Sequence, residues 1–138
     1  MIDYDKFRLS LKRLEEQHQN YQEQDDTLPD LTREAIAESV IQRYETCYDC
    51  LWKVLKRYLT EELGLADTPN SPKPIFRLAN ENSLFASSLE QWLQYADARI
   101  GTSHDYDSKK AEACLTLMPD FIDDAIGLYQ AMSGTTWE

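Results

Sequence analysis

The chain has 138 residues, of which 42% are hydrophobic and 11% aromatic, and its formal net charge is −11. This composition fits one domain over residues 1–138 and excludes an intrinsically disordered chain. Charged residues interrupt every apolar run before it reaches the length of a membrane span, and an odd number of cysteines, three, is typical of a reduced cytoplasmic protein. So acidic a surface repels nucleic acid, because phosphate contacts come chiefly from Lys and Arg. Binding of RNA by this chain would therefore require a local basic patch or the help of a partner protein.

Apolar residues at helical spacing predict five helices and no strands. In chain order we expect them at about residues 4–24, 31–63, 73–82, 87–99 and 107–132. The second helix has the clearest pattern, because its apolar stripe alternates spacings of three and four residues, as the seam of a helical bundle does. The fold class is therefore all-α, an antiparallel, up-and-down bundle of about five helices.

Capping residues mark several of these boundaries. Ser71 stands before Pro72, which suits a cap followed by the first position of the third helix. Ser87 and Glu90 have the spacing of a capping box at the start of the fourth helix. On the first helix, His18 is expected on the solvated face.

The segment at residues 99–106 groups Arg99, His104 and Tyr106 around Gly101. The glycine predicts that the fourth helix stops or bends there, because residues five apart on an uninterrupted helix lie about 140° from each other. Such a turn would bring the guanidinium to the imidazole. A phosphate-binding cation beside a group that titrates near neutrality suits cleavage of a phosphodiester. The alternative is that Arg99 caps helix carbonyls and His104 is an ordinary turn residue.

Two other groups of residues are candidate sites. Lys53, Lys56 and Arg57 form a compact basic cluster, which is either a solvated helix face or a substrate-binding patch for phosphate. Cys47 and Cys50 form a C-x-x-C pair, but this pair lies inside a helix and lacks the second cysteine pair of a zinc site. We therefore expect no metal site and no cofactor. The sequence also lacks the motifs of nucleotide-binding loops, serine hydrolases and zinc proteases.

Several ordered segments of the chain resemble one known family. The resemblance runs over about residues 38–132 and is carried by residues 42–45, 48, 51–59 and 71–74, by the helix with Ala79, by Trp92 seven residues before Arg99, and by the R-x4-H-x-Y signature of Arg99, His104 and Tyr106. On these residues the chain is similar to the nucleotidyltransferase substrate-binding proteins, which are small members of the HEPN superfamily.

The resemblance implies a dimeric helical bundle that works with a minimal nucleotidyltransferase encoded by a neighbouring gene. In such pairs the HEPN protein is a metal-independent ribonuclease toxin, and its partner is the antitoxin, which can transfer AMP to the tyrosine of the motif. By position, Arg99 would hold the phosphate of an RNA substrate and His104 would act as acid or base. Tyr106 would be the modified phenol.

The residue after the motif arginine departs from this pattern. Many members of the family have a polar residue there, often Asn, whereas this chain has Ile100, which cannot donate a hydrogen bond to phosphate. Together with the net charge, Ile100 favours a second interpretation. In this alternative the chain is a non-catalytic substrate-binding or regulatory subunit of a separate nucleotidyltransferase.

Overall fold

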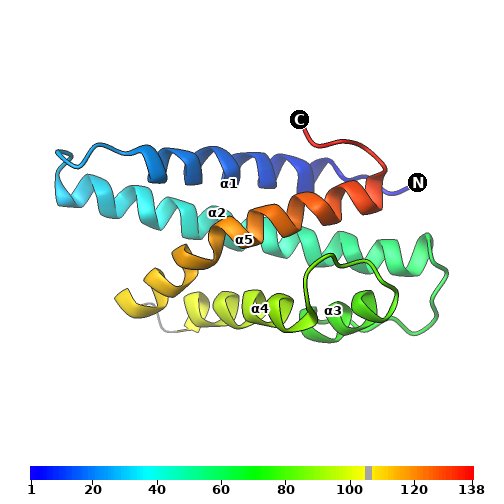
Figure 1. The fold of residues 1–138 in the computed structure, drawn as a ribbon. Helices are drawn as coiled ribbons and strands as arrows, with labels where there is room; N and C mark the ends of the chain where they lie inside the picture. The colour runs from blue at the N-terminus through cyan, green and yellow to red at the C-terminus, as the bar shows by residue number, and fades with distance from the viewer. Residues whose placement is uncertain (105–106) are drawn as a thin grey trace.

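A computed structural model describes residues 1–104 and 107–138, and all regular structure in this part of the chain is helical (Figure 1). Its five helices are α1 (Asp5–Glu23), α2 (Asp30–Glu61), α3 (Pro72–Glu81), α4 (Leu89–His104) and α5 (Ser108–Ser133). The prediction of an all-α bundle is therefore confirmed. In the part of the chain that the structure describes, no helix is long and apolar enough to cross a membrane.

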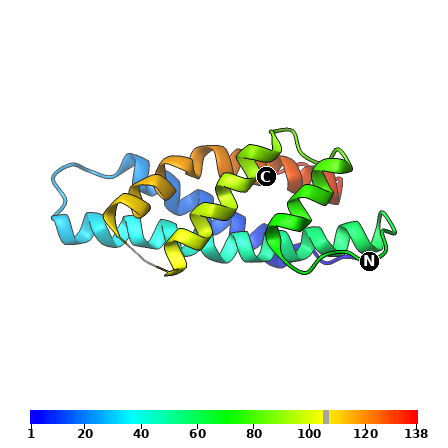
Figure 2. The ribbon, with the colours of Figure 1, turned by 90° about the horizontal axis from the view of Figure 1, so that it is seen from below.

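The long helix α2 organises the bundle, because it contacts each of the other four helices. Figures 1 and 2 show that α1, α2, α4 and α5 run alternately in opposite directions, and that the short α3 lies between α2 and α4 in the chain and packs against both. The two termini lie near the same end of the bundle. Arg99, on the last turns of α4, is therefore held against the middle of α2.

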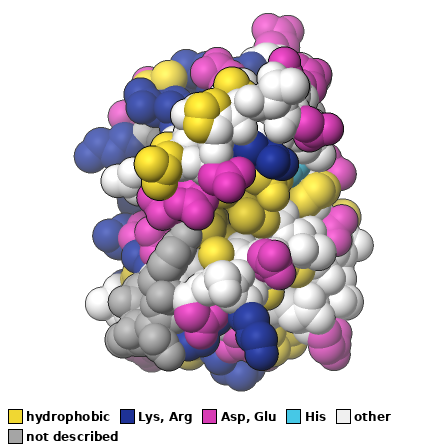
Figure 3. Space-filling model, turned by 90° about the vertical axis from the view of Figure 1, so that its left-hand side faces the viewer, with side chains coloured by type: hydrophobic (Ala, Val, Ile, Leu, Met, Phe, Trp, Pro, Cys, Tyr) yellow, Lys and Arg dark blue, Asp and Glu magenta, His cyan; other side chains and the backbone are white. Residues whose placement is uncertain are grey.

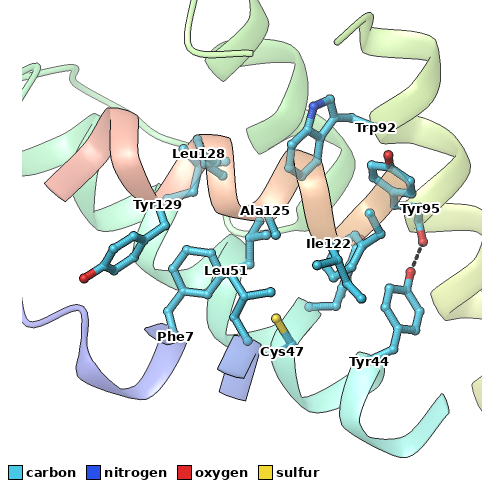
Figure 4. Close-up of a cluster of buried hydrophobic side chains, with 14 of the residues drawn as sticks. Phe7, Tyr44, Cys47, Leu51, Trp92, Tyr95, Ile122, Ala125, Leu128 and Tyr129 are labelled. Carbon is cyan, nitrogen blue, oxygen red and sulfur yellow. Dashed lines mark hydrogen bonds between the residues drawn. The ribbon is translucent and has the colours of Figure 1, made fainter. Parts of the chain in front are cut away.

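Aromatic side chains from three helices meet in the core (Figure 4). The ring of Phe121 on α5 meets Tyr44 of α2 at 4.9 Å and Tyr95 of α4 at 5.2 Å, in both cases edge to face. The Tyr44 hydroxyl donates a hydrogen bond to the backbone carbonyl of Tyr95. Edge-to-face pairs add about 0.5–1.5 kcal/mol each beyond the burial of area, so this cluster fixes α4 on α2.

Local side-chain chemistry explains two of the helix boundaries. Ser71 is the N-cap of α3 and Pro72 is its first residue, as predicted. At the start of α4 the predicted capping box is wrong, because Ser88, not Ser87, accepts the hydrogen bond from the backbone N–H of Gln91. The Ser87 hydroxyl instead donates to the Asp124 carboxylate on α5.

The fourth helix does not end at Gly101 as predicted, but continues to His104. Interior glycine costs a helix only about 1 kcal/mol relative to alanine, and contacts across the bundle outweigh that cost here. Thr102 is 9% exposed, and its hydroxyl donates to the Glu45 carboxylate on α2 at 2.9 Å. The tertiary contact at Thr102 therefore holds the helix together beyond the glycine.

Candidate functional site

Arg99 is anchored to two carboxylates of α2. Its Nη1 donates to Glu45 Oε2 at 3.1 Å, and its Nη2 donates to Asp49 Oδ2 at 3.2 Å, with Nε at 3.4 Å from Asp49 Oδ1. Glu45 and Asp49 are one helical turn apart, so both face α4. Among the described residues, these contacts use three of the five N–H groups of the guanidinium, which leaves two N–H groups that a further oxygen ligand could accept from.

Arg99 keeps its positive charge in this partly buried position. Burial by itself would lower the pKa of the guanidinium, but the hydrogen bond to Asp49 and the negative charges of Asp49 and Glu45 outweigh it and raise the pKa above its ordinary value. The side chain is 24% exposed. The structure thus presents a fixed, permanently charged guanidinium that solvent reaches from one side.

A cavity of about 540 Å³ opens beside this guanidinium. We call it the Arg99 pocket, and it is lined by α2, by the start of α3 and by α4, including Asp49, Trp52, Lys73, Arg77, Arg99 and Ile100. Apolar walls with a few convergent polar groups are typical of small-molecule sites of this size. The pocket therefore has an aromatic surface for a base and cations for a phosphate.

Two of the three cations that line the Arg99 pocket are neutralised by carboxylates of neighbouring helices, whereas Arg77 takes part in no ion pair within the described residues. Lys73 Nζ forms an ion pair with Asp97 Oδ1 on α4 at 2.7 Å, and Arg99 forms ion pairs with Glu45 and Asp49 on α2. On the face of the molecule that Figure 3 shows, acidic and basic side chains are mixed around exposed hydrophobic side chains. The electrostatic potential on this face of the molecule is therefore neither uniformly positive nor uniformly negative.

The sequence-predicted pair Lys53 and Arg57 does not line the Arg99 pocket. Both side chains are on the exposed surface of α2, and Arg57 Nε donates to Glu61 Oε2 at 2.8 Å, one turn along the same helix. The structure instead brings Lys73 and Arg77 of α3 to Arg99. A substrate-binding role for Lys53 and Arg57 stays a prediction.

The other two residues of the motif are only partly described. His104 is the last residue of α4, and its side chain lies outside the described part of the structure, as does the whole of Tyr106. Because α4 is continuous through Gly101, positions 99 and 104 differ by about 140° around its axis. The helix backbone by itself therefore does not turn the two positions to one face.

The cysteines have the properties of core residues. Burial raises the pKa of the Cys47 thiol far above its ordinary value and that of Cys114 to about 12, so neither forms a thiolate near neutrality. Cys50 is half-buried. Within residues 1–104 and 107–138, no three His, Cys, Asp or Glu side chains are grouped as metal ligands would be.

His18 is buried rather than solvated, so the prediction for this residue is wrong. It continues the inward face of α1 at a spacing of four residues from Leu14, a signal that was present in the sequence. Burial lowers the pKa of its imidazole. His18 is thus a neutral core residue near neutrality and lies away from Arg99.

Comparison with known proteins agrees with this architecture. A probable ribonuclease, HepT, of Haemophilus influenzae is 28% identical over 109 residues, which are 78% of this chain and 74% of that protein. A crystal structure from Thermus thermophilus shares 28% identity with a TM-score of 0.75, covering 91% of this chain and 98% of the other.

A second solved structure, from Haemophilus influenzae, shows the same fold. It has a TM-score of 0.85 at 24% identity, covers 95% of this chain and 99% of its own, and is described as the fold of a substrate binding domain of a nucleotidyltransferase. Residues 2–134 match the family described as nucleotidyltransferase substrate binding protein like. The chain belongs to this family, and its fold is the HEPN-like helical bundle.

Proposed function

We propose that this protein is the HEPN component of a two-component nucleotidyltransferase system and that it cleaves RNA. The observation that carries the proposal is the fixed guanidinium of Arg99, which has N–H groups in excess of its two carboxylate partners and lies beside a pocket sized for a nucleotide. The similarity to a probable ribonuclease supports the same substrate class.

The proposed reaction is attack of a ribose 2′-hydroxyl on the adjacent phosphorus. His104 takes the proton of the hydroxyl, and the new O2′–P bond forms as the P–O5′ bond breaks. A proton returns to the leaving 5′-oxygen, which gives a 2′,3′-cyclic phosphate and a 5′-hydroxyl. Arg99 stabilises the negative charge that develops on the phosphoryl oxygens, and the reaction requires no metal ion.

A homodimer would complete this site. On α4, positions 99 and 104 lie on different sides of the helix. A second copy of the chain, packed against the same end of the bundle, would bring its own Arg99 and His104 into a cleft shared by the two copies. Two apolar side chains near that end of the bundle are exposed: Leu31, near the start of α2, is 80% exposed, and Ile100, near the end of α4, is 49% exposed. Exposed apolar surface of this kind is typical of an interface between proteins.

The partner in the proposal is a minimal nucleotidyltransferase that binds the chain and transfers AMP to Tyr106. Attack of the phenol oxygen on the α-phosphate of ATP forms the new P–O bond and releases pyrophosphate, and the phenol proton passes to solvent. An added nucleotide two residues from His104 would block the approach of RNA. The family match supports this partnership.

The alternative function is a non-catalytic subunit that positions a substrate for, or regulates, the nucleotidyltransferase. Two observations favour it: Glu45 and Asp49 already neutralise Arg99, and Ile100 lines the pocket where a polar neighbour would contact phosphate. In that case the Arg99 pocket would hold a ligand without cleaving it.

Expression of the protein without its partner separates these functions. Wild type should slow growth and degrade cellular RNA, whereas Arg99→Ala and His104→Ala should do neither. Lys12→Gln serves as control, because its Nζ lies 4.7 Å from the ring of Trp137, away from the motif. Equal growth and intact RNA in all four strains would remove the enzymatic claim.

Intact-mass measurement after co-expression with the neighbouring nucleotidyltransferase tests the modification. Additions of the mass of AMP that are absent in Tyr106→Phe would support control by the partner. A stable complex without added mass and without RNA cleavage would support the non-catalytic subunit.

A further inference from the structure

A second concave surface lies between α1 and α2. It has a volume of about 600 Å³, and we call it the α1–α2 groove, defined by Lys6 and Arg13 of α1 and by Ser39, Gln42, Arg43 and Thr46 of α2. Three of these residues are cations, and none of the residues that line the groove is acidic. On a chain with a net charge of −11, this concentration of positive charge is a local exception.

The cations of the α1–α2 groove are available to a ligand. Within the described residues, neither Lys6, Arg13 nor Arg43 takes part in an ion pair, in contrast to Arg99 and Lys73. Arg43 Nη1 donates to the backbone carbonyl of Arg13 at 2.8 Å, which fixes its guanidinium across the groove. Among the described residues, the other N–H groups of Arg43 have no partner and are available to an anion.

The neutral residues of the groove indicate which anion it suits. Ser39, Gln42 and Thr46 add hydroxyl and amide donors beside the cations. Side chains of these types, together with Arg and Lys, are among the usual donors to nucleic-acid phosphates. No aromatic residue lines the groove, so it offers no surface on which a base would stack. The groove therefore suits the sugar–phosphate backbone rather than the bases.

The groove and the Arg99 pocket adjoin each other around α2. Thr46 follows Glu45, and Cys50 follows Asp49, and successive residues of a helix differ by about 100°. The groove thus lies roughly a quarter turn around α2 from the carboxylates that hold Arg99. Lys53 is seven residues beyond Thr46 and extends the groove face along the helix.

We propose that the α1–α2 groove binds the phosphodiester backbone of single-stranded RNA, at a site separate from the Arg99 pocket. The inference rests on the proposed function in one respect, that RNA is the substrate class. Phosphates of RNA bind best to Lys and Arg side chains that have no carboxylate partner. The cations of the groove meet this condition better than those of the Arg99 pocket do. A strand bound in the groove reaches Arg99 by following the surface of α2.

Fluorescence anisotropy with a short single-stranded RNA tests this assignment. Every ribose of the probe carries a 2′-O-methyl group, so cleavage cannot interfere with binding. The triple variant Lys6→Gln, Arg13→Gln, Arg43→Gln should bind at least about tenfold more weakly than wild type. The slope of log affinity against log salt should fall by about 2, since each lost contact to a single strand contributes about 0.7.

A charge-matched control keeps the result specific. The triple variant Arg8→Gln, Lys12→Gln, Lys109→Gln removes the same charge from residues that do not line the groove. It should retain most of the affinity and most of the salt slope. An equal loss in both triple variants would show only a response to net charge and would overturn the proposal, as would unchanged binding by the groove variant.

Folding and alternative ligands are tested in parallel. If the triple variant loses its helical circular dichroism, the double variant Lys6→Gln, Arg13→Gln, at two exposed positions, replaces it.

Poly-glutamate serves as the alternative ligand. If wild type binds poly-glutamate as tightly as RNA, and the groove variant loses this binding to the same extent, the groove would be assigned to acidic protein segments and the RNA assignment would be overturned. Failure of cleavage with groove-dependent binding intact would refute only the ribonuclease function.

Discussion

Two cation-bearing surfaces flank helix α2, and they differ in how their charges are used. In the Arg99 pocket, Arg99 and Lys73 are paired with carboxylates of neighbouring helices. In the α1–α2 groove, Lys6, Arg13 and Arg43 have no acidic partner among the described residues. The paired cations are held in one geometry, which chemistry on a phosphate requires, whereas the unpaired cations can take up a phosphate without giving up an existing partner.

This difference shows why total charge is a poor guide to RNA binding. A net charge of −11 averages over the whole surface, but phosphate responds to the field within about 8 Å at physiological salt. The groove supplies such a field, and the pocket supplies orientation. The two surfaces together could perform what neither performs alone, because binding and catalysis place different demands on a cation.

Removal of the paired arginine has the largest expected effect on stability. Arg99→Ala leaves Glu45 and Asp49 close together and partly buried without their cation, and should lower the free energy of unfolding by about 1–2 kcal/mol. Arg13→Ala, in the groove, should change it by less than about 0.5 kcal/mol. Urea denaturation of both variants checks this contrast. Equal losses would mean that the two cations are held in the same way.

A double-mutant cycle measures a smaller part of the same contrast. Arg99→Ala and Asp49→Ala should destabilise less together than the sum of the two single changes, with a coupling free energy of about 1 kcal/mol. The same cycle between Arg99 and Arg13 should give a coupling near zero, since these residues do not touch. Additivity between Arg99 and Asp49 would contradict the proposed anchoring.

Cys50 provides a reporter inside the α1–α2 groove, because it is half-buried and lines it. The native protein should show one thiol that reacts readily with an alkylating reagent, and Cys50→Ser should remove it. Burial raises the pKa values of Cys47 and Cys114 and keeps both unreactive until the protein unfolds. RNA at twice its dissociation constant should slow the reaction about threefold. No protection at saturating RNA would place the strand elsewhere.

The pH dependence of stability gives the smallest expected effect. Burial lowers the pKa of His18, so the unfolded chain binds a proton more readily than the folded one. Stability therefore falls as the pH drops through the unfolded value of about 6.5. His18→Gln should lose this component between about pH 7 and pH 5.5, as measured by urea denaturation.

The helices were predictable because their signals are local. The predicted stripe from Ile36 to Leu63 alternates spacings of three and four residues, and between Val40 and Leu59 all of it except Tyr58 is buried. At its two ends the prediction is less accurate, because Ile36 is only partly buried and Leu63 is exposed. His18 continues a similar spacing on α1, so its position in the helix indicates burial although its neighbours Gln17 and Gln19 are polar. Gly101 was misleading because the contact that holds the helix together, between Thr102 and Glu45, joins residues far apart in the chain.

The sites were less predictable for the same reason. Arg99 stood out through its spacing to His104, but nothing near it in sequence indicates Glu45 and Asp49, its partners on another helix. The α1–α2 groove depends on how α1 packs on α2, which brings Arg13 to Arg43 across thirty residues. Sequence patterns of single helices therefore identified the motif, and only the packing of helices identified the groove.

Steady-state cleavage of a single-stranded RNA tests the central claim most directly, because it separates the two surfaces by kcat and KM. Arg99→Ala should lower kcat by about 10² or more with little change in KM. The groove variant Lys6→Gln, Arg13→Gln, Arg43→Gln should raise KM and leave kcat near the wild-type value. Wild-type kcat in Arg99→Ala would contradict the proposed catalytic role of the Arg99 pocket.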